Sequence, residues 1–582
     1  MDSQRTFLAI TLCVLVILGW NFLTPLMYPA PPEQVNATMQ AGNGTAQAPE
    51  ATQGQKTGAP DALMAEGEEA PVPAQLPAAL PDSGRVVNVE TPLMAVAINP
   101  EGGVVKELQL LKYNEKLGDT GKVKIIDSSA VSYSCLGIYI NGQAAWGESG
   151  WTSGAPEKTT LAGTESATLT FSGNYRGLHI TRELTFKADS YLITEKLRLE
   201  NPGGAALAAK VSYAMGVPSL SAVGNSYNVV KLAHLSSQGK FSTLSDLEDL
   251  EEVGVRAPET SWGTVQNNYF LAAIMPVSQD VLFLGKAEKY TVMPPQKDSK
   301  GKDIQSEVYR IRLEEAAVTL APGGSHEYEV NYYMGPKEYD YLHAAPEGLA
   351  KTMDYGWFGF ISEPMIWFVN FLYSLVGNYG VAIIIMTVVI KLLLWPLSQK
   401  SYKSMERMRK IQPFIKQVQE KYKDDKPEMQ REIMRLYKAY KVNPAAGCLP
   451  ILVQLPVFIG LYQGLLNAVE LRHASFITHL PFTDKFWLAD LSAADPYYIT
   501  PLIMGASMFV QQKMTPPPGD PMQAKMMMFM PLVFIFFFLN FPSGLVVYWL
   551  VNNLLSIAQQ WYTRRSTEKA QAKAESGKAD KA

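Results

Sequence analysis

The feature that most constrains this chain is a series of five apolar segments between Pro364 and Trp561, which carry no charge apart from one lysine in the first segment. The first contains the run from Val381 to Leu397, VAIIIMTVVIKLLLWPL, in which Lys391 carries the only charge. Because a hydrocarbon core of about 30 Å is crossed by roughly 20 helical residues, these segments predict membrane spans. A charge inside a span is costly and usually faces a polar cavity. Lys391 is therefore the first candidate functional residue.

Position alone leaves two interpretations of Lys391 open. It lies six residues before Leu397, about 9 Å by helical rise, so its side chain could extend to the headgroups. If it faces a cavity instead, Thr387 lies one turn earlier on the same helical face. Polar residues of other predicted spans could line the same cavity, although such residues also hold helices together. They are Gln454, Gln511, Gln512, Asn552, Asn553 and Ser556.

Six spans are predicted in all. Residues 1–28 form an anchor rather than a cleaved signal, because their apolar core is about 17 residues long and no small-x-small cleavage pattern follows. Segment 364–376, about 20 Å of helix, is too short to cross and is predicted to be an interfacial helix. The other five spans are expected in 381–397, 447–468, 496–512 and on both sides of a break at 540–544 within 526–563.

The distribution of basic residues predicts the orientation. Loop 398–446 holds 13 Lys and Arg against 6 Asp and Glu, and the tail from residue 563 holds six Lys and Arg. Loop 470–495 has only Arg472 and Lys485. The positive-inside rule then puts both termini and loop 398–446 in the cytoplasm. The large polar region before the spans lies outside, which in a bacterium with two membranes is the periplasm.

Two kinds of sequence precede the five spans. Residues 29–83 are rich in Pro, Ala, Gly and Gln and predict a disordered linker. In residues 84–345, short runs such as ATLTF (167–171), RELTF (182–186) and KLRLE (196–200) place alternate Leu and Phe side chains on one face. Period-2 alternation with one polar face predicts a large antiparallel β-sandwich.

Loop 398–446 predicts a helical hairpin. Apolar residues recur at helical spacing before and after DDKP (424–427), which combines acidic caps with a first-turn proline. The first stripe is Met405, Met408, Ile411, Ile415 and Val418, and the second is Met429, Ile433, Leu436, Tyr437 and Tyr440. The hairpin is either an ordinary solvated connection or a docking surface for ribosomes, nascent chains or anionic lipid.

Other functional classes find little support in the residues. The net charge of −4 carries no nucleic-acid signature, and no nucleotide-binding motif is present. His179, His234 and His326 form no spaced cluster, and the cysteines lie far apart. No metal, cofactor or catalytic residue is expected.

A set of short motifs in the last 240 residues resembles the signature blocks of the YidC membrane-protein insertases, in the order of that family. The motifs are DYGW (354–357), NP (443–444), GCLP (447–450), QLPVF (454–458), DPYY (495–498), QKM (512–514), DPMQ (520–523) and FPSGL (541–545). YYMGPK (332–337) and the β-domain resemble the Gram-negative branch of the family.

The resemblance implies a hydrophilic groove, open to cytoplasm and lipid, within the five-helix core at 378–562. The family most often has arginine where this chain has Lys391, which keeps the charge but loses the five-donor fork. Substrate contacts are implied near Tyr548 and Trp549, and lateral release of the substrate past the second and fourth spans. The β-domain would resemble sugar-mutarotase folds in shape, without that enzyme activity.

The predicted architecture is an α+β membrane protein with six transmembrane helices, a large periplasmic β-sandwich domain and a cytoplasmic helical hairpin. Its parts are the anchor 1–28, the linker 29–83, a β-supersandwich 84–345, connecting and interfacial helices 346–377, the core 378–562 with hairpin 398–446, and a basic cytoplasmic tail 563–582.

The predicted function is that of a membrane protein insertase and chaperone of the bacterial inner membrane, not an enzyme. Its expected partners are nascent membrane proteins, the Sec translocon, the lipid bilayer and, through the hairpin and tail, the ribosome and the signal recognition particle receptor. No other nucleic-acid partner is expected. The alternatives are a polytopic solute transporter, which should show internal repeats, or a membrane-anchored periplasmic enzyme or carbohydrate-binding protein, which would not need five further spans.

Overall fold

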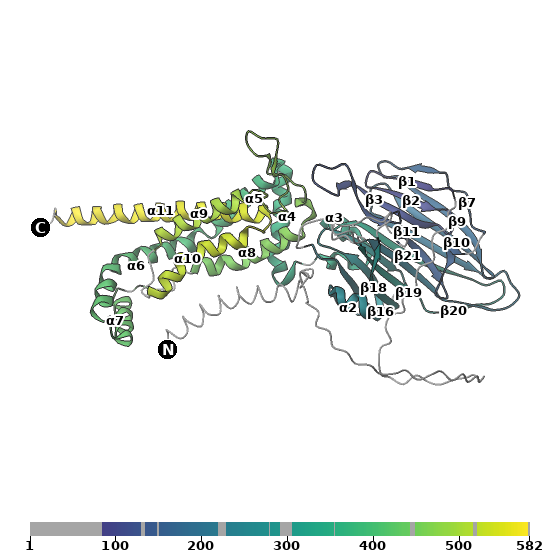
Figure 1. Cartoon of the computed structure of the whole chain (residues 1–582), viewed down its shortest axis with the longest axis horizontal. Helices are drawn as coiled ribbons and strands as arrows, with labels where there is room; N and C mark the ends of the chain where they lie inside the picture. Colours follow the sequence, from purple (N-terminus) through teal and green to yellow (C-terminus); the bar gives the residue numbers. More distant parts are fainter. Residues whose placement is uncertain are drawn as a thin grey trace, which may run out of the picture.

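The structure is a computed structural model that describes residues 84–129, 134–147, 150–218, 228–278, 280–291, 305–353, 355–440, 442, 449–515 and 521–579. The predicted anchor 1–28 and linker 29–83 lie outside these ranges. A domain of β-strands occupies one end of the molecule and a group of helices occupies the other (Figure 1).

The β-domain is built on one long hydrogen-bonded ladder folded into two layers, and β12 (Leu207–Ala209) and β20 (Val318–Leu320) pair as a separate small sheet. Strands β9, β10, β11, β21, β17 and β16 pair in that order in the first layer. Strand β16 then switches partner, and β18, β19, β13, β5, β3, β2 and β1 continue the ladder in the second layer. One apolar core contains buried side chains of both layers, as in a β-sandwich.

The strands have the following bounds: β1 Val87–Glu90, β2 Met94–Asn99, β3 Val104–Asn114, β4 Lys122–Asp127, β5 Leu136–Ile140, β6 Gln143–Ala144, β7 Thr152–Ser153, β8 Lys158–Thr160, β9 Ser166–Tyr175, β10 Leu178–Lys187, β11 Leu192–Glu200, β12 Leu207–Ala209, β13 Val211–Pro218, β14 Lys231–Ser236, β15 Phe241–Leu244, β16 Val255–Gln266, β17 Phe270–Pro276, β18 Val281–Thr291, β19 Gln305–Glu314, β20 Val318–Leu320 and β21 Ser325–Pro336.

The predicted alternation is present in β9, β10 and β11, where every second side chain is buried. The same alternation buries two charged residues that the sequence analysis left out. Arg182 and Glu195 are fully buried and form a bidentate ion pair, with Nε–Oε1 at 2.6 Å and Nη2–Oε2 at 3.0 Å. Arg182 Nη1 also donates to the Gly102 carbonyl, and the Tyr332 hydroxyl donates to Glu195. The network satisfies both charges and joins the two layers.

Short elements connect the β-domain to the helices: α3 Tyr339–Ala344, η3 Pro346–Thr352 and η4 Gly356–Phe358. The helices are α4 Gly359–Val376, α5 Tyr379–Leu393, α6 Trp395–Lys421, α7 Lys426–Ala439, α8 Leu449–Asn467, α9 Ile499–Met514, α10 Pro521–Phe538 and α11 Ser543–Ala579. Between α8 and α9 lie η6 Val469–Leu471, β22 Ile477–His479 and β23 Phe486–Leu488.

Three helix boundaries differ from the sequence expectation. Helix α4 begins at Gly359 rather than at residue 364, because Glu363 is accommodated within the helix. The predicted span 381–397 is divided by a 66° bend between α5 and α6. Pro396 lies in the first turn of α6 and has no N–H for the carbonyl four residues earlier, so the straight helix ends there.

The third difference is at the C-terminus, where α11 continues to Ala579 through the predicted boundary at residue 563. The tail is rich in Ala and Lys, which are strong helix formers. The tail is thus a helical extension of the last predicted span over the part that the structure describes.

Length and composition alone identify few spans. Within the described helices, the segment 356–376 is long and apolar enough to cross a membrane, and the bent α5–α6 pair would be a second candidate. Met527–Phe538 is a shorter apolar helix. Six spans, and the interfacial position of segment 364–376, therefore stay predictions.

Helices α4 and α8 approach closely through a GxxxG motif that the sequence analysis missed. Gly460 and Gly464 lie one turn apart on α8, and the Ser362 hydroxyl of α4 donates to the Gly460 carbonyl at 2.6 Å. A Cβ added at Gly464 would lie 2.8 Å from the Ile366 side chain. Small residues at this spacing let two helix backbones pack tightly, as in membrane helix pairs.

The β-domain is docked on one end of the helical region. Arg472, just after η6, donates to the Asn114 and Glu115 carbonyls at 2.7 Å each and lies over the Phe270 ring at 5.7 Å. Val469 of η6 is buried in the β-domain core. The two parts are therefore held together by a buried cation and by shared apolar packing.

An acidic residue, Glu470, is partly buried beside this junction. Glu470 Oε1 accepts a hydrogen bond from Asn370 Nδ2 at 3.3 Å. Burial raises the pKa of Glu470 from its ordinary value near 4.5 to about 7, and the carboxylates of Glu338 and Asp340 add to the rise. The charge state of the junction thus changes near neutral pH.

Candidate functional site

Lys391 points into the helical region. It lies in the last turn of α5, and only 7% of the residue is exposed. Its Nζ donates to Ser556 Oγ at 2.6 Å and to Asn552 Oδ1 at 3.3 Å, both on α11. The side chain therefore lies toward α11 rather than toward the end of its own helix. Its role in a substrate groove stays a prediction.

The positive charge of Lys391 is stabilised by neutral dipolar groups: the end of its own helix and the side chains of Asn552 and Ser556. Among the ion pairs of the described residues, none includes Lys391. A cation in the last turn of a helix is favoured by the helix dipole, and the amide and hydroxyl oxygens of Asn552 and Ser556 accept two of the three ammonium hydrogens. A buried ammonium held in this way keeps its attraction for an incoming carboxylate.

A small hollow lies beside the ammonium. It is lined by Ile390, Lys391, Leu394, Leu397, Ser398, Gln454 and Asn552 and has a volume of ≈10 Å³. This is at the lower limit for one water molecule. The hollow is much smaller than the groove that the family resemblance implies, so in this conformation a substrate would need the helices to separate.

The position of α11 explains how the site is built. Helices α5 and α9 each pack against α11, whereas any direct contact between α5 and α9 is slight in the described part of the chain. Asn552 bonds Lys391 on α5, and the next residue, Asn553, donates from Nδ2 to Ser507 Oγ on α9 at 3.1 Å. Asn552 and Asn553 of α11 thus form a polar surface, here called the polar floor, between the helices α5 and α9, which form the two walls of the site.

Two more predicted residues join this site and one lies beside it. Gln454 of α8 lines the hollow, and its Nε2 donates to the Tyr548 hydroxyl of α11 at 3.4 Å. Thr387 is buried one turn before Lys391, and its hydroxyl donates to the Ile383 carbonyl of its own helix. Thr387 therefore lies on the predicted face without a bond to the lysine.

Three predicted residues lie elsewhere. Gln512 Nε2 donates to the Met527 carbonyl of α10, and no side-chain hydrogen bond to the Lys391 group is found for Gln511 among the described residues. Trp549 packs among aromatic rings, with its ring 4.6 Å from that of Phe458. These positions differ from the expectation because the helical phase of α9 and α11 turns them toward other neighbours.

The polar floor continues along α11 beyond the residues that were predicted from sequence. Gln559 Nε2 donates to the Trp395 carbonyl, Gln560 Nε2 to the Met514 carbonyl, and the Thr563 hydroxyl to Gln399 Oε1. Gln559 and Gln560 lie seven residues, about two helical turns, after Asn552 and Asn553, and Thr563 lies one turn further, so helical spacing would have found them. The buried polar stripe thus extends from Lys391 toward the end of the molecule that carries α6 and α7 (Figure 1).

The outer surface of the helical region is unlike that of a water-soluble bundle. Helix α10 exposes Phe529, Leu532, Val533 and Phe536. Polar side chains of α11 are buried instead: Asn552, Asn553, Ser556, Gln559, Gln560 and Thr563. Large apolar side chains are also exposed on α4 and α9: Trp367, Phe371, Leu375, Leu502, Ile503, Phe509 and Val510. Large apolar side chains exposed on several helices are typical of a surface that contacts lipid or another protein.

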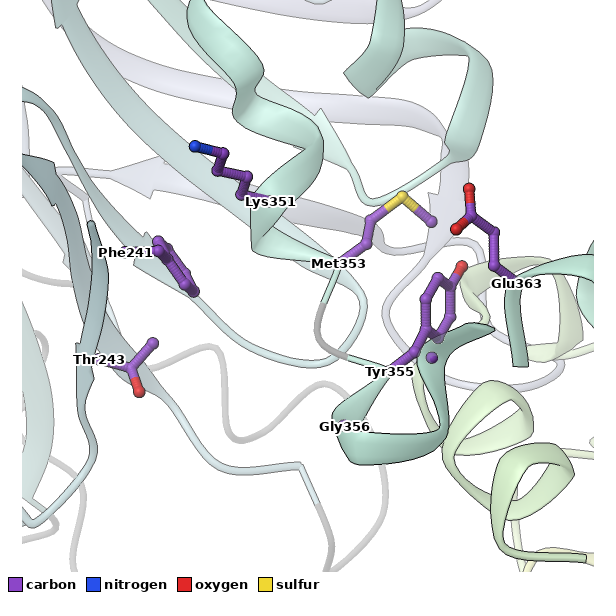
Figure 2. A pocket seen from close by; sticks show the side chains of 8 residues that line it. Phe241, Thr243, Lys351, Met353, Tyr355, Gly356 and Glu363 are labelled. Carbon is purple, nitrogen blue, oxygen red and sulfur yellow. The ribbon is translucent and has the colours of Figure 1, made fainter. Parts of the chain in front are cut away.

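A larger cavity lies where the β-domain meets the first helices, and Lys391 is not among its lining residues. It has a volume of ≈360 Å³ and is lined by Phe241, Thr243, Lys351, Met353, Tyr355, Gly356, Gly359 and Glu363. Figure 2 shows Lys351 and Glu363 on opposite sides of the hollow. Lys351 Nζ already donates to the Gly239 carbonyl at 3.2 Å. Lys351 and Glu363 are exposed and opposite in charge, and they indicate no particular class of ligand. The cavity is therefore not assigned as the functional site on its size alone.

Apolar side chains exposed on three helices, a buried polar stripe along α11 and a large β-domain at one end are typical of a membrane protein with a water-exposed domain. The profile of the family described as 60Kd inner membrane protein matches residues 371–571, and that of the YidC periplasmic domain matches residues 86–368. The chain belongs to the YidC membrane protein insertase family, as the sequence motifs predicted.

Full-length relatives support this assignment. The chain is 47% identical over 97% of its length to the membrane protein insertase YidC of Nitratidesulfovibrio vulgaris, of which 100% is covered. It is 44% identical over 97% of its length to that of Oleidesulfovibrio alaskensis, again with 100% covered. A solved structure described as an active YidC insertase matches 84% of this chain and 95% of its own at 21% identity, with a TM-score of 0.35.

Proposed function

We propose that this protein inserts other proteins into the bacterial inner membrane. The observation that carries the proposal is the buried ammonium of Lys391, held at 2.6 Å by Ser556 on a polar floor between α5 and α9. Family membership and the names of the full-length relatives support the same activity. The clients would be nascent membrane proteins.

The barrier that such a protein lowers is the burial of polar backbone. Moving a polar segment of a client through hydrocarbon exposes unpaired N–H and C=O groups, each costing several kcal/mol. The amides and hydroxyls of α11 would pair with these groups when α5 and α9 separate. Lys391 would attract acidic residues of the segment, and Gln454 and Tyr548 would extend the polar lining. The apolar part of the client would then leave sideways between α5 and α9.

No chemical step is needed in this mechanism. The free energy would come from burying the apolar segment of the client and from the membrane potential, about 2.3 kcal/mol per charge per 100 mV. The hydrogen bonds of Lys391 to neutral partners support an electrostatic role for it.

We also propose the topology of six spans with both termini in the cytoplasm and the domain 84–345 in the periplasm. The hairpin α6–α7 and the β-domain lie at opposite ends of the helical region, which supports placing them on opposite sides of the membrane (Figure 1). The basic loop 398–446 would then meet the ribosome or the signal recognition particle receptor, and the Sec translocon would be a lateral partner. Neither a transporter nor a carbohydrate-binding function is favoured by a specific observation.

The test compares charge variants at the site. Insertion of a client with an acidic amino-terminal segment is measured in vesicles containing wild-type protein, Lys391→Arg, Lys391→Gln or Lys391→Glu. We expect Lys391→Arg to keep most activity and Lys391→Glu to lose about tenfold or more, since a reversed charge repels the client. A client whose acidic residues are replaced by neutral ones should be much less sensitive.

The matched control is Lys116→Glu, which makes the same charge change at an exposed position of the β-domain. Equal insertion of the acidic client by wild-type protein, Lys391→Glu and Lys116→Glu would refute the electrostatic role of Lys391.

A further inference from the structure

The loop between α8 and α9 contains a small, well-braced β-hairpin. Strand β22 pairs with β23 in the register Ile477 to Leu488 and His479 to Phe486. The tip is closed by hydrogen bonds from Leu480 N to the Lys485 carbonyl at 2.9 Å and from Thr483 N to the Leu480 carbonyl at 3.0 Å. The tip therefore has a defined conformation.

Phe482 at this tip is unusual in two independent ways. Its side chain is fully exposed, and its backbone is left-handed, with φ of 67°. A bulky residue in this conformation is strained, whereas Gly or Asn would make the turn with less strain. A solvated aromatic ring on a strained backbone buries no apolar surface that would stabilise the chain itself. Such an outlier suggests a functional contact.

The base of the hairpin is tied to the ends of two predicted spans. The Asn378 side chain, at the start of α5, donates to the Phe476 carbonyl at 3.1 Å. Trp487 Nε1 donates to Asp495 Oδ1 at 3.0 Å, just before α9. The hairpin is thus attached where α5 and α9 begin, and the first turns of α9 expose Leu502 and Ile503.

We propose that the β22–β23 hairpin is a membrane-interface anchor, with the Phe482 ring inserted at the boundary of headgroups and acyl chains. The proposal rests on the proposed placement of α5 and α9 in the membrane. Aromatic residues are favoured at this depth, and exposed Lys485 would lie near lipid phosphates. One aromatic ring suffices for such a contact, whereas a stable protein partner needs about 800 Å² of complementary surface.

Anchoring at this position would serve the proposed function. The hairpin follows α8 and precedes α9, and its base contacts the first turn of α5. A ring fixed in the lipid would hold the outer ends of both groove walls at a constant depth while the opposite ends separate around a client. Phe482 would then act as a positioning residue, without contact with the client.

The test uses the full-length protein in vesicles of phosphatidylethanolamine and phosphatidylglycerol. A benzophenone amino acid replaces Phe482, and in a matched control it replaces Val253, an exposed apolar residue just after helix α2 (Leu247–Glu252) of the β-domain. After irradiation, intact-mass measurement counts adducts of one phospholipid. We expect about tenfold more lipid adduct at 482 than at 253, the factor that burial of an aromatic ring provides.

Lipid adduct at 482 no higher than at 253 overturns the proposal, and so does an adduct at 482 that consists only of protein. Client insertion is measured in the same vesicles. Normal insertion without lipid adducts refutes the anchor alone, whereas failure of the wild-type protein to insert the client refutes the proposed function. Phe482→Gly, which relieves the strained backbone, should fold normally but insert the client less well than Phe482→Trp; equal insertion by the two variants counts against the anchor.

Discussion

The hydrogen bond between Lys391 and Ser556 leads to a prediction of definite size. Ser556 Oγ accepts from Nζ at 2.6 Å and donates to the Asn552 carbonyl at 2.7 Å. Ser556→Ala removes the nearer acceptor of a buried cation, and a hydrogen bond to a charged group contributes about 1.5–3 kcal/mol. The adjacent hollow of ≈10 Å³ leaves little room for a replacing water. We therefore expect Ser556→Ala to lower the free energy of unfolding by about 1.5–3 kcal/mol.

A double-mutant cycle isolates this interaction. In the Lys391→Met background there is no ammonium, so Ser556→Ala should cost only a few tenths of a kcal/mol. The coupling energy between positions 391 and 556 should therefore be about 1–3 kcal/mol. Denaturant unfolding of the four detergent-solubilised variants, followed by circular dichroism, measures it.

The matched control is Ser507→Ala, which removes a similar hydroxyl on the other side of the floor, bonded to neutral Asn553. Its cost should be the same with and without Lys391→Met. A coupling energy below about 0.5 kcal/mol between Lys391 and Ser556 would show that the ammonium is not held there, and would refute the inward position of the lysine.

Three further predictions concern the rest of the chain. Arg182→Met should cost about 3–5 kcal/mol in thermal unfolding because it leaves Glu195 buried and unpaired, whereas adding Glu195→Leu should restore most of the loss. The pKa of Glu470 is raised to about 7, so the folded state binds the proton more tightly and stability should fall as pH rises from about 4.5 through 7. Glu470→Gln should abolish this pH dependence of stability and raise the free energy of unfolding by at most about 3 kcal/mol at pH 8. An unchanged pH dependence would show that Glu470 is not the group responsible. Gly464→Val should destabilise the protein by about 1–3 kcal/mol through a clash with Ile366, while Gly464→Ala should cost less.

Local patterns in the sequence predicted the strands of the β-domain and the helical hairpin α6–α7 well. Alternation in RELTF placed Leu184 and Phe186 on a buried face, and both are buried in β10. The same parity also points Arg182 inward, but the sequence does not say that Glu195 lies opposite it. That pairing depends on the register between β10 and β11, in which Arg182 faces Leu197 and only the diagonal neighbour is Glu195.

In the candidate site, too, the residues could be predicted from sequence but their partners could not. Lys391, Asn552 and Ser556 could be selected from sequence because polar residues in apolar segments are rare and costly. Their meeting could not be predicted, since α5 and α11 are separated by 161 and 165 residues at the two hydrogen bonds. Gln512 and Trp549 are equally polar or aromatic, yet they face α10 and an aromatic cluster.

The amino-acid sequence by itself determined the family, the division into a strand-rich and a helical part, and the residue types available for a polar interior. The family follows from the ordered short motifs, and the other two follow from composition and periodicity, which depend on neighbours only a few residues apart. Only the tertiary structure decided which wall each polar side chain of α11 faces, how the β-domain docks through Arg472, and that α5 bends into α6. Helical phase and crossing geometry set those contacts, and a rotation of one residue, about 100° around a helix, moves a side chain from one neighbour to another.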